Sequence, residues 1–70
     1  MLTLEQRNKM VEDIYNKASN NNDGEIWIRP SNYGFPHSSE GNDECIKVLR
    51  NLNICKKIIV DGKDLLRIQV

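Results

Sequence analysis

The sequence predicts a single α+β domain over residues 1–70, with two main helices packed on one face of a small three-stranded antiparallel sheet that includes a C-terminal β-hairpin. Two segments carry apolar residues at helical spacing, and three carry them at strand-like spacing. Clusters of Asn, Gly, Pro and Asp separate these segments. A chain of this length buries only about 60% of its unfolded surface, so its stability is expected to be marginal.

The first predicted helix begins after Thr3. Thr3 is an N-cap residue, and Gln6 follows at the position that a capping box requires. Arg7 interrupts the apolar stripe, although its aliphatic stem can lie along that stripe. The segment SNNNDG at residues 19–24 ends the helix, because asparagine and glycine tolerate the left-handed conformation. The predicted stripe comprises Leu4, Met10, Val11, Ile14, Tyr15 and Ala18.

A short strand is predicted at residues 25–29, where apolar and polar residues alternate. Ile26 and Ile28 share one face, and Trp27 lies on the opposite, polar face. Pro30 ends the strand because proline has no backbone donor.

The second predicted helix has Ser39 or Asn42 as its N-cap and Asn53 as its C-cap. Asp43 and Glu44 suit the positive end of the helix dipole. The predicted core-facing stripe comprises Cys45, Val48, Leu49 and Leu52.

Residues 54–70 predict a β-hairpin around Asp61-Gly62, a pair that favours a two-residue loop. A loop with an odd number of residues nevertheless places the apolar side chains of both strands on one face more consistently. It leaves only Lys56 and Asp64 as polar residues on that apolar face. We therefore predict a three-residue loop with a bulge. The expected core of the domain is Leu4, Val11, Ile14, Ile26, Ile28, Val48, Leu49, Leu52, Ile58, Val60, Leu66 and Ile68.

This order of helix, strand, loop, helix and hairpin resembles that of small winged-helix domains. The resemblance covers most of the chain but involves no sequence motif. It implies that residues 42–52 form a recognition helix and that the hairpin forms a wing. Winged-helix domains have a further helix before the recognition helix, and here the segment PSNYGFPHS at residues 30–38 takes its place. With two prolines and a glycine, that segment holds at most about one helical turn.

The net charge is zero, but it is unevenly distributed. Residues 1–44 contain four basic and eight acidic residues, and residues 45–70 contain six basic and two acidic residues. Such asymmetry indicates either a basic face for a polyanion or ordinary surface charge that folding evens out.

One functional hypothesis is a DNA-binding, transcription-regulator-like domain that uses the basic C-terminal half. Cationic side chains contact phosphate, and Arg and Asn read base edges. Overall neutrality counts against this hypothesis, as do Asp43 and Glu44 at the start of the second helix. The predicted nucleic-acid contacts are Lys47, Arg50, Asn51, Lys56, Lys57, Lys63 and Arg67.

The alternative hypothesis is a protein-interaction module, such as an inhibitor or adaptor of the kind that phages and mobile elements encode. Exposed aromatic residues are enriched at binding hot spots, and Trp27, Tyr33 and Phe35 are the candidates around the loop at residues 29–41. In so small a domain these aromatic residues can instead belong to the core. We expect this of Phe35, and the sequence leaves Tyr33 open.

Catalysis, metal binding and cofactor binding are not expected. His37, Cys45 and Cys55 have no metal-ligand spacing, and His37 has no partner at a spacing typical of nucleophilic catalysis. The chain contains no apolar run long enough for a membrane span and no signal-peptide core, so we expect a cytoplasmic protein with reduced thiols. The sequence is compatible with a homodimer.

Overall fold

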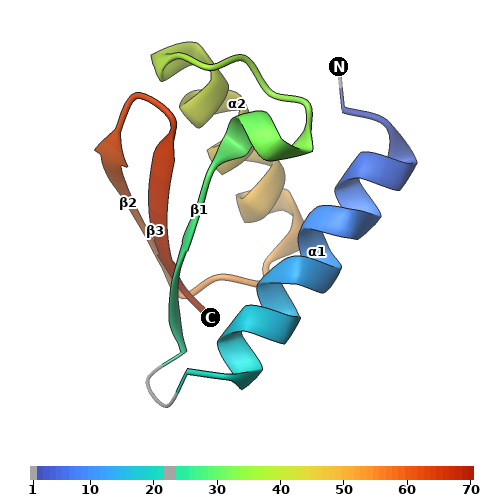
Figure 1. Ribbon diagram of the computed structural model, residues 1–70, viewed down its shortest axis with the longest axis vertical. Helices are drawn as coiled ribbons and strands as arrows, with labels where there is room; N and C mark the ends of the chain where they lie inside the picture. Colours follow the sequence, from blue (N-terminus) through green and yellow to red (C-terminus); the bar gives the residue numbers. More distant parts are fainter. Residues whose placement is uncertain (1, 22–23) are drawn as a thin grey trace.

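The computed structural model describes residues 2–21 and 24–70 of the chain, and it has the predicted α+β layout (Figure 1). None of the described helices is long and apolar enough to cross a membrane. In chain order the elements are α1 (Leu4–Ser19), β1 (Glu25–Ile28), the 3₁₀ helix η1 (Pro30–Tyr33), α2 (Ser39–Leu52), β2 (Lys57–Gly62) and β3 (Leu65–Gln69).

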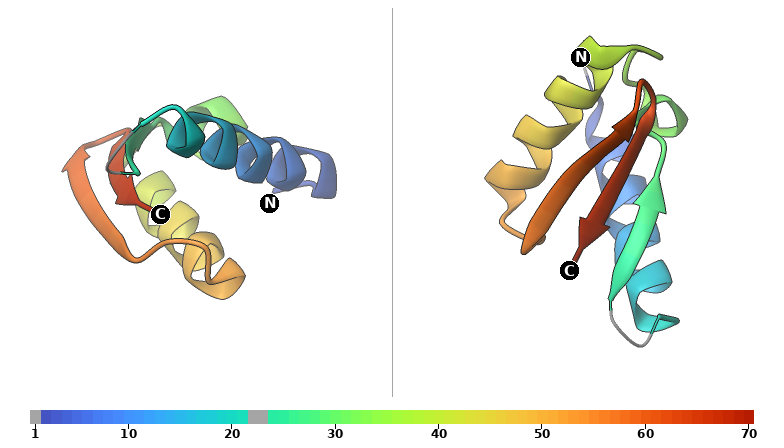
Figure 2. Two further views of the ribbon diagram at one scale, coloured as in Figure 1. Left: turned by 90° about the horizontal axis from the view of Figure 1, so that it is seen from below. Right: turned by 90° about the vertical axis from the view of Figure 1, so that its left-hand side faces the viewer.

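The three strands form an antiparallel sheet in the order β1-β3-β2, with β3 in the centre. Ile26 and Ile58 both pair with Ile68, and Ile28 and Val60 both pair with Leu66. These pairs bring the apolar side chains of all three strands onto one face. Both helices cover that face, and the opposite face is open (Figure 2).

The hairpin has the predicted face assignment but a different turn. The ladder is regular from Lys57 to Val60, and it shifts register between Val60 and Gly62, which is the predicted bulge. Gly62 pairs with Leu65, so the tight turn is at residues 63–64 rather than at Asp61-Gly62. The prediction of a three-residue loop was wrong, because the extra residue is accommodated within the strand.

Capping residues close in sequence determine where the two α-helices begin and end. Thr3 and Gln6 form the predicted capping box, with hydrogen bonds of 2.9 and 3.1 Å. Asn53 is the predicted C-cap of α2 and has a φ of 55°. The N-cap of α2 is Ser38, whose hydroxyl accepts from the Gly41 amide, so the predicted caps Ser39 and Asn42 were both wrong. The predicted stop of α1 includes residues 22 and 23, which lie outside the described residues.

Half of the predicted core residues are buried: Ile14, Ile26, Ile28, Leu49, Leu66 and Ile68. Val11, Val48, Leu52 and Ile58 are partly buried. Leu4 and Val60 are 63% and 55% exposed, so their assignment to the core was wrong. Leu4 lies in the first turn of its helix, and Val60 lies beside the bulge, near the end of the hairpin.

Four further side chains complete the buried core: Met10, Tyr33, Phe35 and Cys45. Two of them come from the loop at residues 29–41. Within this loop Gly34 has a φ of 97°, which permits the tight turn after η1. The loop therefore supplies apolar area that a three-stranded sheet and two helices of this size do not provide.

Candidate nucleic-acid interface and interhelical groove

The outward side of α2 is solvent-exposed and changes from acidic to basic along the helix. Acidic side chains occupy its first half, where the positive end of the helix dipole favours them. The three side chains of this helix that we predicted for nucleic-acid contact are all exposed in its second half. In chain order, the exposed charged or amide side chains are Glu40, Asp43, Glu44, Lys47, Arg50 and Asn51.

The basic surface continues into the chain that follows α2. Lys56 and Lys57 are exposed and lie immediately beyond the end of the helix, where the chain enters β2. Among the described residues, Lys47, Arg50, Lys56 and Lys57 form no ion pair. We call these four residues, together with Asn51, the basic surface.

The structure distinguishes the other two predicted contacts from this surface, Lys63 by its position and Arg67 by its ion pair. Lys63 lies in the hairpin turn, at the opposite end of β2 from Lys57 (Figure 1). The side chain of Asn42, in the first half of α2, donates to the Gly62 carbonyl, so the turn lies beside the acidic part of the helix. Arg67 lies on the open face of the sheet, as Lys57 does, but its Nε is 3.1 Å from a Glu25 carboxylate oxygen, so its charge is paired.

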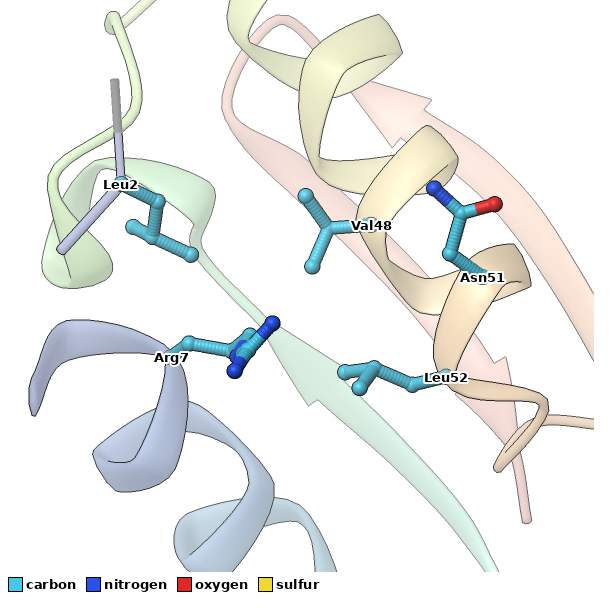
Figure 3. Close-up of a pocket in the computed structure, with 5 residues that line it drawn as sticks. All are labelled: Leu2, Arg7, Val48, Asn51 and Leu52. Carbon is cyan, nitrogen blue, oxygen red and sulfur yellow. The ribbon is translucent and has the colours of Figure 1, made fainter. Parts of the chain in front are cut away.

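A groove of about 310 Å³ lies between the two helices. Leu2 and Arg7 line it from the α1 side, and Val48, Asn51 and Leu52 line it from α2 (Figure 3). The side chains of Leu2 and Val48 point toward each other, and the Arg7 side chain extends toward Leu52. The described residues that line the groove thus combine three aliphatic side chains with one guanidinium and one amide.

A polar cluster connects the loop to the hairpin turn. Asp64 is 5% exposed, and its two oxygens accept from the backbone amide and the hydroxyl of Ser31 at 2.9 and 2.5 Å. His37 Nε2 lies 3.4 Å from the same carboxylate. Burial acts to raise the pKa of Asp64, but the Ser31 hydrogen bonds and the positive charges of His37 and Arg29 outweigh it and lower that pKa.

This cluster does not have the order of a nucleophilic triad. In a triad the histidine lies between the hydroxyl and the carboxylate. Here the carboxylate of Asp64 lies between Ser31 and His37 and accepts the hydrogen bond of the serine hydroxyl directly. The cluster therefore holds η1 against the hairpin, and it explains why a carboxylate is buried in the turn just before β3.

The two cysteines are reduced, and Cys45 is fully buried, as its place on the helix stripe predicts. Burial raises the pKa of the Cys45 thiol to about 12, and Cys55 and Asp64 add to this rise. Burial also raises the pKa of Cys55. Among the described residues, no group of three or more His, Cys, Asp or Glu side chains is placed to hold a metal ion.

The aromatic residues do not form one surface. Tyr33 and Phe35 are buried, and the Tyr33 hydroxyl donates to Asp13 at 3.0 Å, so neither side chain offers exposed contact area. The expectation that Phe35 belongs to the core is confirmed, and Tyr33 joins it. Trp27 is 55% exposed on the open face of the sheet. Of the aromatic residues in the alternative hypothesis, Trp27 alone is on the surface.

Sequence reasoning missed two features of these sites. Arg7 was treated as an interruption of an apolar stripe, with its stem lying along that stripe, and the structure shows that it lines the groove between the helices. Asp64 was treated as a misfit, although a buried carboxylate requires hydrogen-bond donors beside it. The partner, Ser31, is 33 positions away, and no local pattern connects the two residues.

No protein-family model matches the chain, and neither a curated protein nor a solved structure matches it.

Proposed function

We propose that this domain binds nucleic acid, with duplex DNA as the expected partner and transcriptional regulation as the expected role. The observation that carries the proposal is the basic surface, whose four exposed cations form no ion pair among the described residues and lie, with the exposed Asn51, in the second half of α2 and at the start of β2. Phosphate contact requires cationic side chains within reach of the backbone, and Asn51 can donate to and accept from a base edge. The winged-helix-like layout is consistent with this proposal.

The acidic first half of α2 restricts the docking geometry. Glu40, Asp43 and Glu44 would repel phosphate if the start of the helix entered the major groove. We therefore propose that the second half of α2 and the start of β2 face the duplex. With contacts made mainly to phosphate, binding is expected to depend strongly on salt and weakly on sequence.

Fluorescence anisotropy with a labelled mixed-sequence duplex tests the proposal. If the four cations each neutralise one phosphate, affinity should fall about 100-fold between 50 and 200 mM salt. Replacing Lys47 and Arg50 with alanine removes two of these contacts, so the fall should shrink to about tenfold. The matched control replaces Lys9 and Lys17, two exposed lysines of α1, and removes the same charge from another surface.

Two results would contradict the proposal. One is the absence of binding at 50 mM salt. The other is an equal loss of affinity in the α2 variant and the α1 control, which would show that binding follows total charge rather than the basic surface.

Trp27 favours a second candidate function, contact with a protein partner through the open face of the sheet. Trp27, Arg67 and Ile59 form one row across the three strands, and no element of the described chain covers them (Figure 2). Tryptophan and arginine are enriched at interface hot spots. Trp27 is the single tryptophan of the chain, so a partner that covers this face should shift its fluorescence emission to shorter wavelength. A bound partner that leaves the emission unchanged would rule out this face as its docking site.

A further inference from the structure

We infer that the groove between α1 and α2 binds a compact amphipathic carboxylate, with Arg7 holding the carboxylate and Leu2, Val48 and Leu52 holding the apolar part. This site differs from the basic surface and does not depend on nucleic-acid binding. Asn51 lies at the edge of both.

The shape of the groove sets the size of the ligand. Its volume of about 310 Å³ is at the lower end of the range of about 300–1,000 Å³ that is typical of ligand pockets. Such pockets are mainly apolar, with a few polar groups that orient the ligand. The groove has this composition, because aliphatic side chains from both helices face each other and the polar groups are one guanidinium and one amide (Figure 3).

Arg7 sets the charge of the ligand. Within the described chain its side chain forms no ion pair or hydrogen bond, and it extends across the groove beside aliphatic side chains. None of the described residues that line the groove is acidic. A guanidinium presents its donors in a planar fork that matches a carboxylate, and Arg7 is exposed, so this fork is accessible to a ligand. The Asn51 amide can donate a further hydrogen bond to the same group.

A single arginine favours a monoanion. A second cation would be expected for a phosphate or for an acidic macromolecule. Leu2, Val48 and Leu52 are each partly buried, so they leave apolar area for a short aliphatic or aromatic group. The predicted ligand class is therefore a small monocarboxylate with an apolar body.

Octanoate is a suitable probe, and 1-octanol and octylammonium are its matched neutral and cationic analogues. Titrations followed by NMR should show that octanoate shifts the methyl signals of Leu2, Val48 and Leu52, with a Kd of the order of 1 mM. Octanol should bind about five- to tenfold more weakly, and octylammonium more weakly still, because neither pairs with Arg7.

The decisive variant is Arg7→Met, which keeps the aliphatic length of the side chain and removes its charge. The expected result is that octanoate and octanol bind this variant equally well, while octanol affinity stays within about twofold of that of the native chain. Lys9→Met, on another side of the same helix, is the matched control and should retain the preference for octanoate. An unchanged NMR spectrum outside the groove would show that each variant is folded.

Three outcomes would overturn the inference. The native chain could bind octanol as tightly as octanoate, or Arg7→Met could retain the native preference for octanoate. The third outcome is that an acidic amphipathic helical peptide shifts the NMR methyl signals of the groove residues while octanoate at 10 mM does not. That result would assign the groove to a protein segment.

Discussion

The most informative single substitution is at Asp64, because one buried carboxylate holds the loop and the hairpin together. Asp64→Ala removes the acceptor for two donors of Ser31 and the partner of His37. Asp64→Asn keeps the shape of the side chain and one acceptor oxygen, but it removes the charge. The pair of variants therefore separates the charge from the packing.

The expected cost follows from the contacts. A hydrogen bond to a charged group contributes about 1.5–3 kcal/mol, and the two bonds share one acceptor group and are not additive. His37 adds little, because its side chain is 69% exposed. We expect Asp64→Ala to lower the free energy of unfolding by about 2–3 kcal/mol and Asp64→Asn to lower it by about 1–2 kcal/mol. A chain of this length has a total stability of about 4–10 kcal/mol, so either loss is large.

The cost should depend on pH, and its sign follows from the lowered pKa of Asp64. An unfolded aspartate has a pKa of about 3.9. Because the folded pKa is lower, the unfolded chain binds the proton more tightly, and Asp64 stabilises the fold above about pH 4. This contribution is lost as the pH falls through the folded pKa. The difference between the native chain and Asp64→Asn should therefore be constant near neutral pH and shrink below about pH 4.

Urea unfolding followed by far-UV circular dichroism, repeated between pH 7 and pH 2.5, measures these differences. Asp61→Asn is the matched control, because it removes an exposed carboxylate from the same hairpin and should change stability by less than about 0.5 kcal/mol. A cost of Asp64→Ala below about 0.5 kcal/mol would refute the role of the carboxylate. A cost of Asp64→Asn that does not change between pH 7 and pH 2.5 would refute its attribution to charge.

Three further predictions concern the core. Leu49→Ala should lower the free energy of unfolding in urea by about 2–5 kcal/mol because the side chain is fully buried, and a loss below about 1 kcal/mol would contradict its place in the core. Gly41→Ala should lower the melting temperature, although alanine normally favours a helix by about 1 kcal/mol, because a Cβ at this position would clash with the Pro36 carbonyl; a higher melting temperature would contradict this contact. In the native protein at pH 8, a thiol reagent should modify the partly exposed Cys55 first and modify Cys45 only on unfolding, and equal rates for the two thiols would contradict the burial of Cys45.

The helices and the first strand could be predicted because each depends on interactions between residues close in sequence. The capping box at Thr3 and Gln6, the left-handed Asn53 and the alternation around Ile26 and Ile28 each depend on residues a few positions apart. The face assignment of the hairpin was predictable for a related reason, because a slip of one residue would expose every apolar side chain on one strand. The position of the turn was not, because a bulge and a longer loop leave the same residues on the core face.

The direction of loop side chains was not predictable from local pattern. Tyr33 and Phe35 belong to no periodic segment, and their burial depends on contacts such as the hydrogen bond from Tyr33 to Asp13. Trp27 was predictable, because strand alternation places it opposite Ile26 and Ile28. The charge split likewise shows which half of the chain is basic. It does not show that the turn carrying Lys63 lies beside the acidic half of α2, which depends on the contact between Asn42 and Gly62.

The position of the loop also explains why the interhelical groove is open. Its residues cover one side of α1, where Tyr33 bonds to Asp13 and Gly34 lies close to the Gln6 side chain. Arg7 lies on another side of the helix, in line with Leu4, Val11 and Tyr15 at spacings of three or four residues. Leu4 and Tyr15 are 63% and 47% exposed, so this side lacks the cover that the loop gives its neighbour. A longer helical segment in place of η1 would have more side chains to cover α1, but two prolines limit the segment to a single short turn. The short η1 segment therefore leaves apolar surface and Arg7, which has no ion pair within the described part of the chain, together between the helices.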